Sequence, residues 1–475
     1  MQYTRRNFVK QSLCATAFAS SQTFTANSFA AVTTKNQDNE NAIIEAVKNL
    51  KSGKNIQLKL LYPQGSIGNI KPVATLFTKH TGVKISFIKT TVDDINTKIF
   101  IDTAGQKSSF DIALPATFGI PDLAEAGALA DQSSYAQKYE KLIDYKPSLY
   151  SLGDRYKHAF YGYQTDGDAY LTFFHKDCME NPDEQKKFAD KHGRELTLPQ
   201  TWEELDQLME FFHRPNEEKF GGCLFRTPGY MVWEWWIRFH AKNHFPVQDD
   251  MTPNINNQAG VEALEDLLRA TQFQHPSART NGLFDNWSEY AKGHCAVNIG
   301  WGGTQKFLNS KTSKMKDRLL FAPTPQISYF NWGWNYVTSK LSAHKEIAYL
   351  FSLYATLARP SKIAVQNQTG FFDPFRECHY TDPKIEQSYS KEFLVAHKQA
   401  MKTAIPDFYL KGQGKYIQTL RENITSAAEK EISPREALSF TAKQWEMITE
   451  EEGRDGQIEQ WLFLKKQYPK HLNLK

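Results

Sequence analysis

The first regular pattern along the chain is an alternation of apolar strands with amphipathic helices. Apolar spacing predicts a helix that contains Ile70 and Phe77 and is capped by Gly82, with strands and one more helix around it. The predicted strands cover 56–62, 83–88 and 110–114, and the second helix covers about 92–104. Strand and helix alternate, which favours an α/β fold with a parallel sheet.

Ligands of such sheets bind at the carboxyl ends of the strands. The loops at 62–69 and 115–119 are therefore the first places where a site is expected.

Later segments contain clearer signals for where helices and strands begin and end. Thr201 is followed three residues later by Glu204, which predicts a capping box at the start of a helix. Residues 295–300 read as a buried strand that leads into a glycine-rich turn. A helix after Ser342 has apolar side chains at helical spacing, and we expect Pro360 to stop it.

The N-terminus has the order of a secretory signal peptide. Thr4 to Lys10 contains paired arginines followed by Phe8, which matches a twin-arginine export signal. An uncharged, mildly apolar stretch follows, and the segment ends in small residues at Ser28-Phe29-Ala30. We expect residues 1–30 to be removed on export to the periplasm and residues 31–54 to form an N-terminal extension.

Charge and hydropathy exclude two classes of partner. Removal of the signal peptide takes three positive charges from a formal net charge of +4 and leaves +1. A nearly neutral mature chain gives no electrostatic reason to expect nucleic acid or an anionic membrane as a partner. No further apolar stretch is long enough to serve as a transmembrane anchor.

The cysteines do not indicate a metal or redox centre. Cys178, Cys223, Cys295 and Cys378 remain in the mature chain, and they contain no Cys-x-x-Cys pair. This spacing disfavours zinc ribbons, iron–sulfur clusters and thioredoxin chemistry, so we expect neither a cofactor nor a metal. Whether the cysteines pair or remain buried thiols stays open.

The aromatic content, 13% of the chain, is the main chemical clue to a ligand. Sugar rings have apolar faces and a rim of hydroxyl groups, so their sites combine flat aromatic walls with carboxylates. Trp301 lies between glycines at a strand end, where it is well placed for a wall and where Gly302 allows close backbone approach. Alternation places Trp332 and Trp334 on one face of an extended segment, for which core packing is an equal explanation.

Three further segments hold candidate ligand groups. In the aromatic segment 233–236 we expect Trp235 or Trp236 to face the ligand, whereas the others pack in the core. Asp166 and Asp168 are candidate acceptors of hydroxyl hydrogen bonds, and a solvated turn is the alternative. Phe371 and Phe372, which precede Asp373, are candidates at the mouth of a site, although a tight turn over the core is the slightly favoured interpretation.

Several of these segments, in this order, resemble the family 1 extracellular solute-binding proteins, the maltose-binding-like group. The resemblance is carried by His80-Thr81-Gly82-Val83-Lys84-Ile85, Phe110-Asp111-Ile112-Ala113, Leu123 to Leu129, Tyr161 to Asp177, Pro199 to Leu205, Cys295 to Trp301 and Trp332 to Lys362. It implies a two-lobed α/β periplasmic binding protein fold with discontinuous lobes joined by crossing hinge strands. We expect one lobe at 55–165 plus 301–360 and the other at 166–300 plus 361–475.

The resemblance also implies that the protein binds its ligand without catalysing a reaction. A sugar or polyol would bind between the lobes, the hinge would close, and the closed form would dock on an inner-membrane ABC permease. We expect a monomer. A polyamine is the alternative ligand, since aromatic walls with Asp166 or Asp168 can hold a cation. An exported carbohydrate-active enzyme and a periplasmic sensor partner also stay open as functions, although the sequence has none of the common hydrolase or nucleotide-binding motifs.

Overall fold

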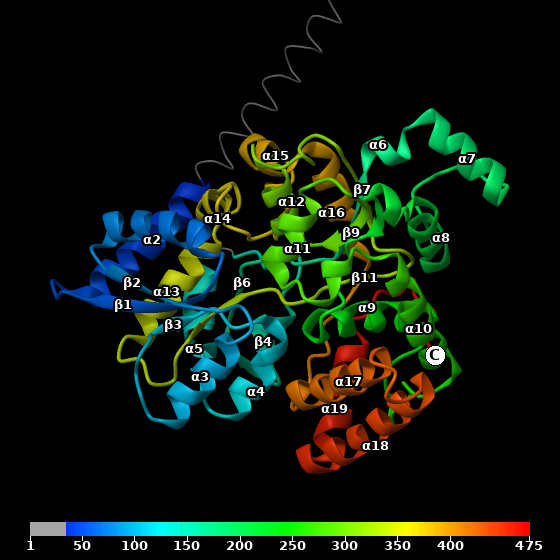
Figure 1. The fold of residues 1–475 in the computed structure, drawn as a ribbon. Helices are drawn as coiled ribbons and strands as arrows, with labels where there is room; N and C mark the ends of the chain where they lie inside the picture. The colour runs from blue at the N-terminus through cyan, green and yellow to red at the C-terminus, as the bar shows by residue number, and fades with distance from the viewer. Residues whose placement is uncertain (1–34, 144) are drawn as a thin grey trace, which may run out of the picture.

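The computed structural model describes residues 35–143 and 145–475, and it contains two main sheets with helices packed against them (Figure 1). The predicted signal peptide, residues 1–30, lies outside the described residues. None of the helices in the described part is both long and apolar enough to cross a lipid bilayer.

The first sheet has five strands in the order β2-β1-β3-β12-β6. Their bounds are β1 Gln57–Pro63, β2 Lys84–Thr90, β3 Ile112–Ala113, β6 Gly162–Gln164 and β12 Asn335–Thr338. Strand β1 pairs in parallel with β2 and β3, which confirms the parallel arrangement predicted for the first three strands. Strand β12 returns much later in the chain and pairs antiparallel with β3 and β6.

Helices from both ends of the sequence cover this sheet. Helix α2 (Ile67–Thr81) packs against α13 (Lys345–Thr356) and α14 (Ala358–Val365), while α3 (Ile95–Ala104) contacts β1 and α4 (Ile120–Glu125). The predicted cap of α2 is confirmed: Gly82 has φ +74°, a left-handed conformation that glycine adopts without a steric cost, and its N–H donates to the carbonyl of Thr78.

The second sheet has four strands in the order β10-β7-β9-β8. Their bounds are β7 Leu171–His175, β8 Phe220–Gly222, β9 Cys295–Gly300 and β10 Leu319–Pro323. Every residue of β7 and β9 is buried, as expected for central strands covered on both faces. Helices α8 (Trp202–Phe212) and α16 (Lys391–Thr403) pack against this sheet.

A helical layer completes the molecule. It joins α9 (Pro228–Ala241) and α10 (Gln258–Ala270) to the C-terminal helices α17 (Gln413–Ala428), α18 (Pro434–Glu452) and α19 (Arg454–Lys465). The remaining elements are short or peripheral: α5 Ser133–Tyr139, α6 Lys176–Met179, α7 Pro182–His192, α11 Leu283–Tyr290, α12 Gly302–Leu308, α15 Pro383–Tyr389, β4 Arg155–Tyr156, β5 Ala159–Phe160, β11 Ser328–Tyr329 and β13 Ala404–Ile405.

Two local predictions need correction. Pro360 does not stop the helix after Ser342: α13 ends at Thr356, Leu357 is extended, and Pro360 lies in the first turn of α14, where a missing N–H is tolerated. The capping box at α8 is only half formed. Thr201 accepts the N–H of Glu204, but the Glu204 carboxylate accepts from Gln200 instead of Thr201.

The lobe boundaries stay a prediction, with one relevant observation. Strand β10 lies within 301–360, the range assigned to the first lobe, but it pairs with β7 in the second sheet. The chain therefore returns to the first sheet only after β10. No disulfide joins the four cysteines of the described part, and Cys223 and Cys295 are buried thiols.

Candidate functional site

An inner cavity lies where elements of the two sheets meet. It has a volume of about 60 Å³, enough for roughly four or five water molecules. Its wall is mainly aromatic, with a few polar groups. The lining residues are Gln64, Ser66, Val92, Asp168, Tyr230, Leu283, Phe284, Trp287, Trp301, Gly303, Trp332, Trp334 and Phe371. Of the ten residues predicted from sequence, the structure brings Asp168, Trp301, Trp332, Trp334 and Phe371 together here.

Trp301 is a rigid part of the wall. It follows directly after strand β9, and its N–H donates to the hydroxyl of Thr304 at 3.1 Å, which fixes the start of α12. Its indole N–H donates to the carbonyl of Asn331 at 3.2 Å, and its ring centroid lies 4.6 Å from that of Tyr170. Because the backbone N–H and the indole N–H are both hydrogen-bonded and the ring packs against Tyr170, the indole has a defined position in the wall of the cavity.

Trp332 and Trp334 both line the inner cavity, but the segment is not extended as the alternation assumes: the chain bends at Trp332, and Gly333 between the two rings has φ +35°. Trp332 has φ +84°, a left-handed conformation that costs a bulky residue about 1–3 kcal/mol and is frequent at functional sites. Its ring stacks on Tyr230 of α9, with centroids 5.7 Å apart. The indole lies between two cavities, because Trp332 also lines a second, larger space.

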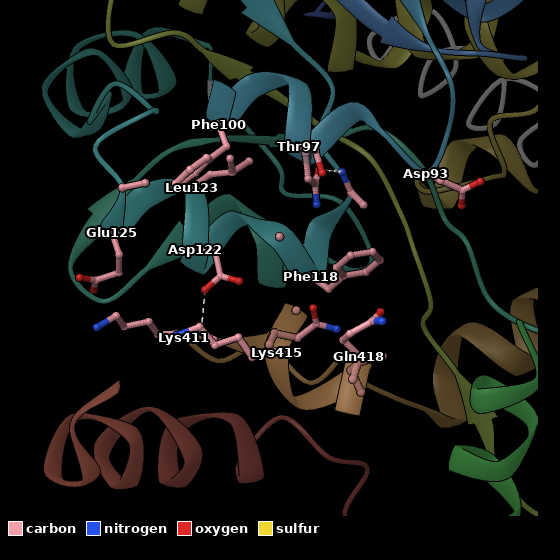
Figure 2. A pocket seen from close by; sticks show the side chains of 18 of the residues that line it. Asp93, Thr97, Phe100, Phe118, Asp122, Leu123, Glu125, Lys411, Lys415 and Gln418 are labelled. Carbon is pink, nitrogen blue, oxygen red and sulfur yellow. Dashed lines mark hydrogen bonds between the residues drawn. The ribbon is translucent and has the colours of Figure 1, made fainter. Parts of the chain in front are cut away.

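The outer groove is this larger space, with a volume of about 720 Å³. Figure 2 shows its side chains from α3 and α4 facing those near the start of α17. Asp122 of α4 accepts the N–H of Gly412 at 2.6 Å and so bridges the two sides. The groove shares the lining residues Val92 and Trp332 with the inner cavity, so the two spaces adjoin.

Both loops predicted to form a site contribute to these spaces. Gln64 and Ser66, from the loop after β1, line the inner cavity, and Ala116, Phe118 and Gly119, from the loop after β3, line the outer groove. This placement follows the rule for the carboxyl ends of parallel strands.

Asp166 and Asp168 belong to a buried carboxylate cluster that also contains Asp373. Burial raises the pKa of Asp373 to about 6, although N–H groups of Gly302 and Gly303 oppose the shift. Burial also raises the pKa values of Asp166 and Asp168, and it lowers that of the neighbouring Lys306 to about 7. Asp168 alone of the three carboxylates reaches the inner cavity.

Gly302 and Phe372 make backbone hydrogen bonds with the cluster and with the neighbouring Lys306. The N–H of Gly302 donates to Asp373 at 2.7 Å, and the carbonyl of Phe372 accepts from Lys306 at 3.2 Å. Neither residue lines the inner cavity or the outer groove. Phe371 does line the inner cavity, where its ring meets Trp287 edge to face.

Trp235 and Trp236 line neither space. Both have 0% exposure, and their rings contact Phe239 and Phe408 in the core. The residue of this segment that faces the outer groove is Trp233. Helix α9 is buried on all sides from Tyr230 to Ala241, and its charged residues are paired internally, Glu234 with Arg226 and Arg238. Aromatic content therefore could not show which indole faces a ligand.

The remaining cavity residues were not singled out from sequence, although Gln64 and Ser66 belong to a loop that was expected to form a site. Tyr230, Phe284 and Trp287 add aromatic area, while Gln64 and Ser66 add polar groups. The spacing of Phe284 and Trp287, three residues apart on α11, is a helical-face signal, but core packing produces the same spacing.

Known proteins with similar sequences and folds agree with this architecture. The family model described as "Bacterial extracellular solute-binding protein" matches residues 65–359. A "Mannitol-binding protein" of Pseudomonas aeruginosa is 22% identical over 302 residues, which cover 61% of this chain and 66% of that protein, slightly less than two thirds of its length.

Solved structures share the fold. T. maritima MalE3 with bound maltose superposes with a TM-score of 0.71 at 16% identity, covering 83% of this chain and 100% of the other. A solute-binding protein of Agrobacterium vitis with bound D-mannitol gives 0.67 at 15% identity, covering 84% and 99%. A protein of Agrobacterium radiobacter in complex with ribitol gives 0.69 at 15% identity, covering 83% and 98%. Because the family model spans more than half of the chain, this protein belongs to the bacterial extracellular solute-binding protein family, whose members bind solutes and are not enzymes.

Proposed function

We propose that this protein captures a small polyol or monosaccharide where the inner cavity meets the outer groove, and that it delivers the ligand to an ABC permease. The observation that carries the proposal is the wall of the cavity. Flat rings of Trp301, Trp332, Trp334 and Tyr230 surround a few polar groups, among them the Asp168 carboxylate. Aromatic faces suit the C–H surface of a polyol, and carboxylate or amide oxygens accept its hydroxyl hydrogen bonds.

The volumes of the two spaces indicate that the ligand occupies both. The inner cavity, at about 60 Å³, is too small for a whole polyol, whereas the adjoining outer groove, at about 720 Å³, has room for the rest of the molecule. Similar proteins are described with mannitol, ribitol and tagatose, which are all small, and also with maltose. The polyamine alternative has weaker support, because Asp168 is the only acidic residue among the described residues that line the inner cavity.

Delivery requires export and a change of shape. We infer that the twin-arginine signal at Thr4 to Lys10 directs the protein to the periplasm. Two lobes would form around the two sheets, with crossing segments between β6 and β7 and between β10 and β12. Ligand bound between them would stabilise the closed form that the permease recognises.

The test is a ligand panel followed by a pair of tryptophan variants. Calorimetric titration and thermal unfolding of the mature protein would be measured with mannitol, ribitol, tagatose, maltose and putrescine. A ligand that binds only the folded state, present at a hundredfold excess over its Kd, stabilises it by about 2.7 kcal/mol. We expect the strongest response from a polyol or monosaccharide that is recovered unchanged. A response to putrescine alone would overturn the ligand class.

Trp301→Phe and Trp445→Phe form a matched pair. Both indoles donate to a backbone carbonyl, Trp301 to Asn331 and Trp445 to Tyr416, but Trp445 lies in the C-terminal helices and lines neither space. We expect Trp301→Phe to weaken polyol binding about tenfold, roughly 1.4 kcal/mol, whereas Trp445→Phe lowers stability with an unchanged Kd. Equal losses of affinity in both variants would place the ligand elsewhere.

A further inference from the structure

The buried carboxylate cluster is built from two distant parts of the chain. Asp166 and Asp168 follow β6 on the segment that leads to β7, and Asp373 follows α14. Each offers an oxygen, and these oxygens lie within 4.8 Å of one another. The residues are 1%, 9% and 0% exposed, so water contributes little to the solvation of their charges. Three carboxylates at this depth need compensation by bound positive charge or by protons.

The cationic side chains nearby do not fill this role by direct contact. All three N–H groups of Lys306 are used by carbonyls: Asn367 at 3.0 Å, Gly370 at 2.6 Å and Phe372 at 3.2 Å. His397 Nε2 lies 3.9 Å from Asp373, beyond hydrogen-bond distance, and its hydrogen bond is with the carbonyl of Gly167 at 3.0 Å. The cluster therefore keeps an excess of negative charge or holds protons.

One oxygen of the cluster is unused. Asp166 Oδ1 accepts the N–H of Asp373 at 2.5 Å, whereas its Oδ2 is buried and has no hydrogen-bond partner among the described residues. A buried carboxylate oxygen without a partner is costly, and a ligand in the cluster would remove that cost.

We propose that Asp166, Asp168 and Asp373 bind a divalent cation of the calcium type. Ca²⁺ binds carboxylate oxygens at about 2.3–2.6 Å, so two ligands of one ion lie at most about 5 Å apart, which matches the spacing here. An all-oxygen set selects hard cations over zinc or copper. Protein carboxylates alone leave positions for water or a ligand hydroxyl, which the flexible coordination of Ca²⁺ tolerates better than that of Mg²⁺.

The cation site extends the proposed function without depending on it. Asp168 belongs both to the cluster and to the wall of the inner cavity, so a bound cation lies at the edge of that cavity. The proposed cation site also differs from the expectation drawn from the sequence, which indicates neither a cofactor nor a metal. Residues 166 and 373 are far apart in the chain, and their spacing contains no metal-binding motif.

The test uses calcium alone, without any sugar or polyol. The mature protein is treated with EDTA and dialysed, then titrated with CaCl₂ by calorimetry and with TbCl₃ by tryptophan-sensitised luminescence. We expect one site per chain, a calcium Kd in the range of about 10⁻⁵ to 10⁻³ M, displacement of terbium by calcium, and a rise of the unfolding midpoint by about 2 °C or more at tenfold excess. Because no polyol is present, failure of the ligand panel leaves this result intact.

Asp166→Asn and Asp190→Asn are the matched variants. In Asp166→Asn the amide keeps an oxygen for the N–H of Asp373 but removes the charge, and Asp190 is exposed on α7. We expect Asp166→Asn to weaken calcium binding at least tenfold and Asp190→Asn to leave it unchanged.

Three outcomes would overturn the proposal. They are no calcium or terbium binding by wild-type protein at 10 mM, unchanged binding in Asp166→Asn, and equal loss in both variants. In the first case protons, not a cation, neutralise the cluster. If Asp166→Asn does not fold, the wild-type titration with terbium and its displacement by calcium decide the question.

Discussion

Buried Asp407 shows how a single residue can set the pH dependence of stability. Its two oxygens lie 3.5 Å from the hydroxyls of Tyr329 and Tyr150, and burial raises its pKa to about 8. In the unfolded chain an aspartate titrates near pH 4. Between about pH 4 and pH 8 the folded protein therefore keeps a proton that the unfolded chain has lost, and this residue makes stability fall as pH rises.

We expect Asp407→Asn to remove this contribution, because the amide does not titrate. Between pH 5 and pH 7 the free energy of unfolding of the variant would then fall less steeply than that of the wild type. The two slopes would differ by about 1.4 kcal/mol per pH unit. Urea denaturation at several pH values measures the slope, with the exposed Asp455→Asn as control. Identical slopes in wild type and Asp407→Asn would show that Asp407 is ionised in the folded protein.

Single residues also show what sequence can and cannot reveal about a site. Trp301 could be predicted as part of a wall because it lies between glycines at a strand end. Trp332 and Trp334 line the same cavity, but the alternation that suggested this assumed an extended segment, whereas the chain bends at Trp332 and Gly333. Trp235 and Trp236 could not be separated from Trp233, because α9 is buried on every side and has no polar face that marks its orientation. Such contacts depend on tertiary packing, which local patterns do not encode.

At the scale of elements, the helix over residues 35–51 packs into the core, whereas the sequence predicts an N-terminal extension at 31–54. Its Ile43 and Val47 have 0% exposure, and Glu40 pairs with Arg359 at the start of α14. We expect Ile43→Ala to lower the free energy of unfolding by about 2–5 kcal/mol, the usual cost of truncating a buried isoleucine. Chemical denaturation measures this change.

The exposed Glu45→Gln on the same helix is the control, with an expected change within about 0.5 kcal/mol. A similarly small effect of Ile43→Ala would mean that the helix is detached from the core in solution.

The elements themselves are predicted best where a local signal fixes them. Gly82 ends α2 as expected, because a left-handed cap is a strong local requirement. The prediction for Pro360 is wrong because proline is compatible both with the end of one helix and with the first turn of the next. The pairing of β10 with β7 could not be predicted, because strand pairing between distant segments leaves no mark in either segment.

At the scale of the whole molecule, a hydrogen-bonded contact at Asp122 helps to join the two sides of the outer groove. Asp122 on α4 accepts N–H groups from Gly412 and Gly414 at the start of α17. Figure 2 shows this carboxylate pointing across the groove toward the segment near Lys411. The first side belongs to the unit around β1 and β3, and the second side belongs to the C-terminal helical layer. If closure traps the ligand, as proposed, this contact forms part of the closed state and should favour it.

Asp122→Ala therefore tests the link between shape and affinity. Loss of two hydrogen bonds, each about 0.5–1.5 kcal/mol, should weaken polyol binding about tenfold and increase the radius of gyration of the ligand-free protein in small-angle scattering. Asp122→Asn keeps an acceptor oxygen and should bind nearly as tightly as wild type. Unchanged affinity and scattering in Asp122→Ala would show that this contact contributes nothing to closure. A loss of affinity without a change in scattering would assign Asp122 to the binding surface, because only an effect that acts through the open and closed populations changes both measurements together.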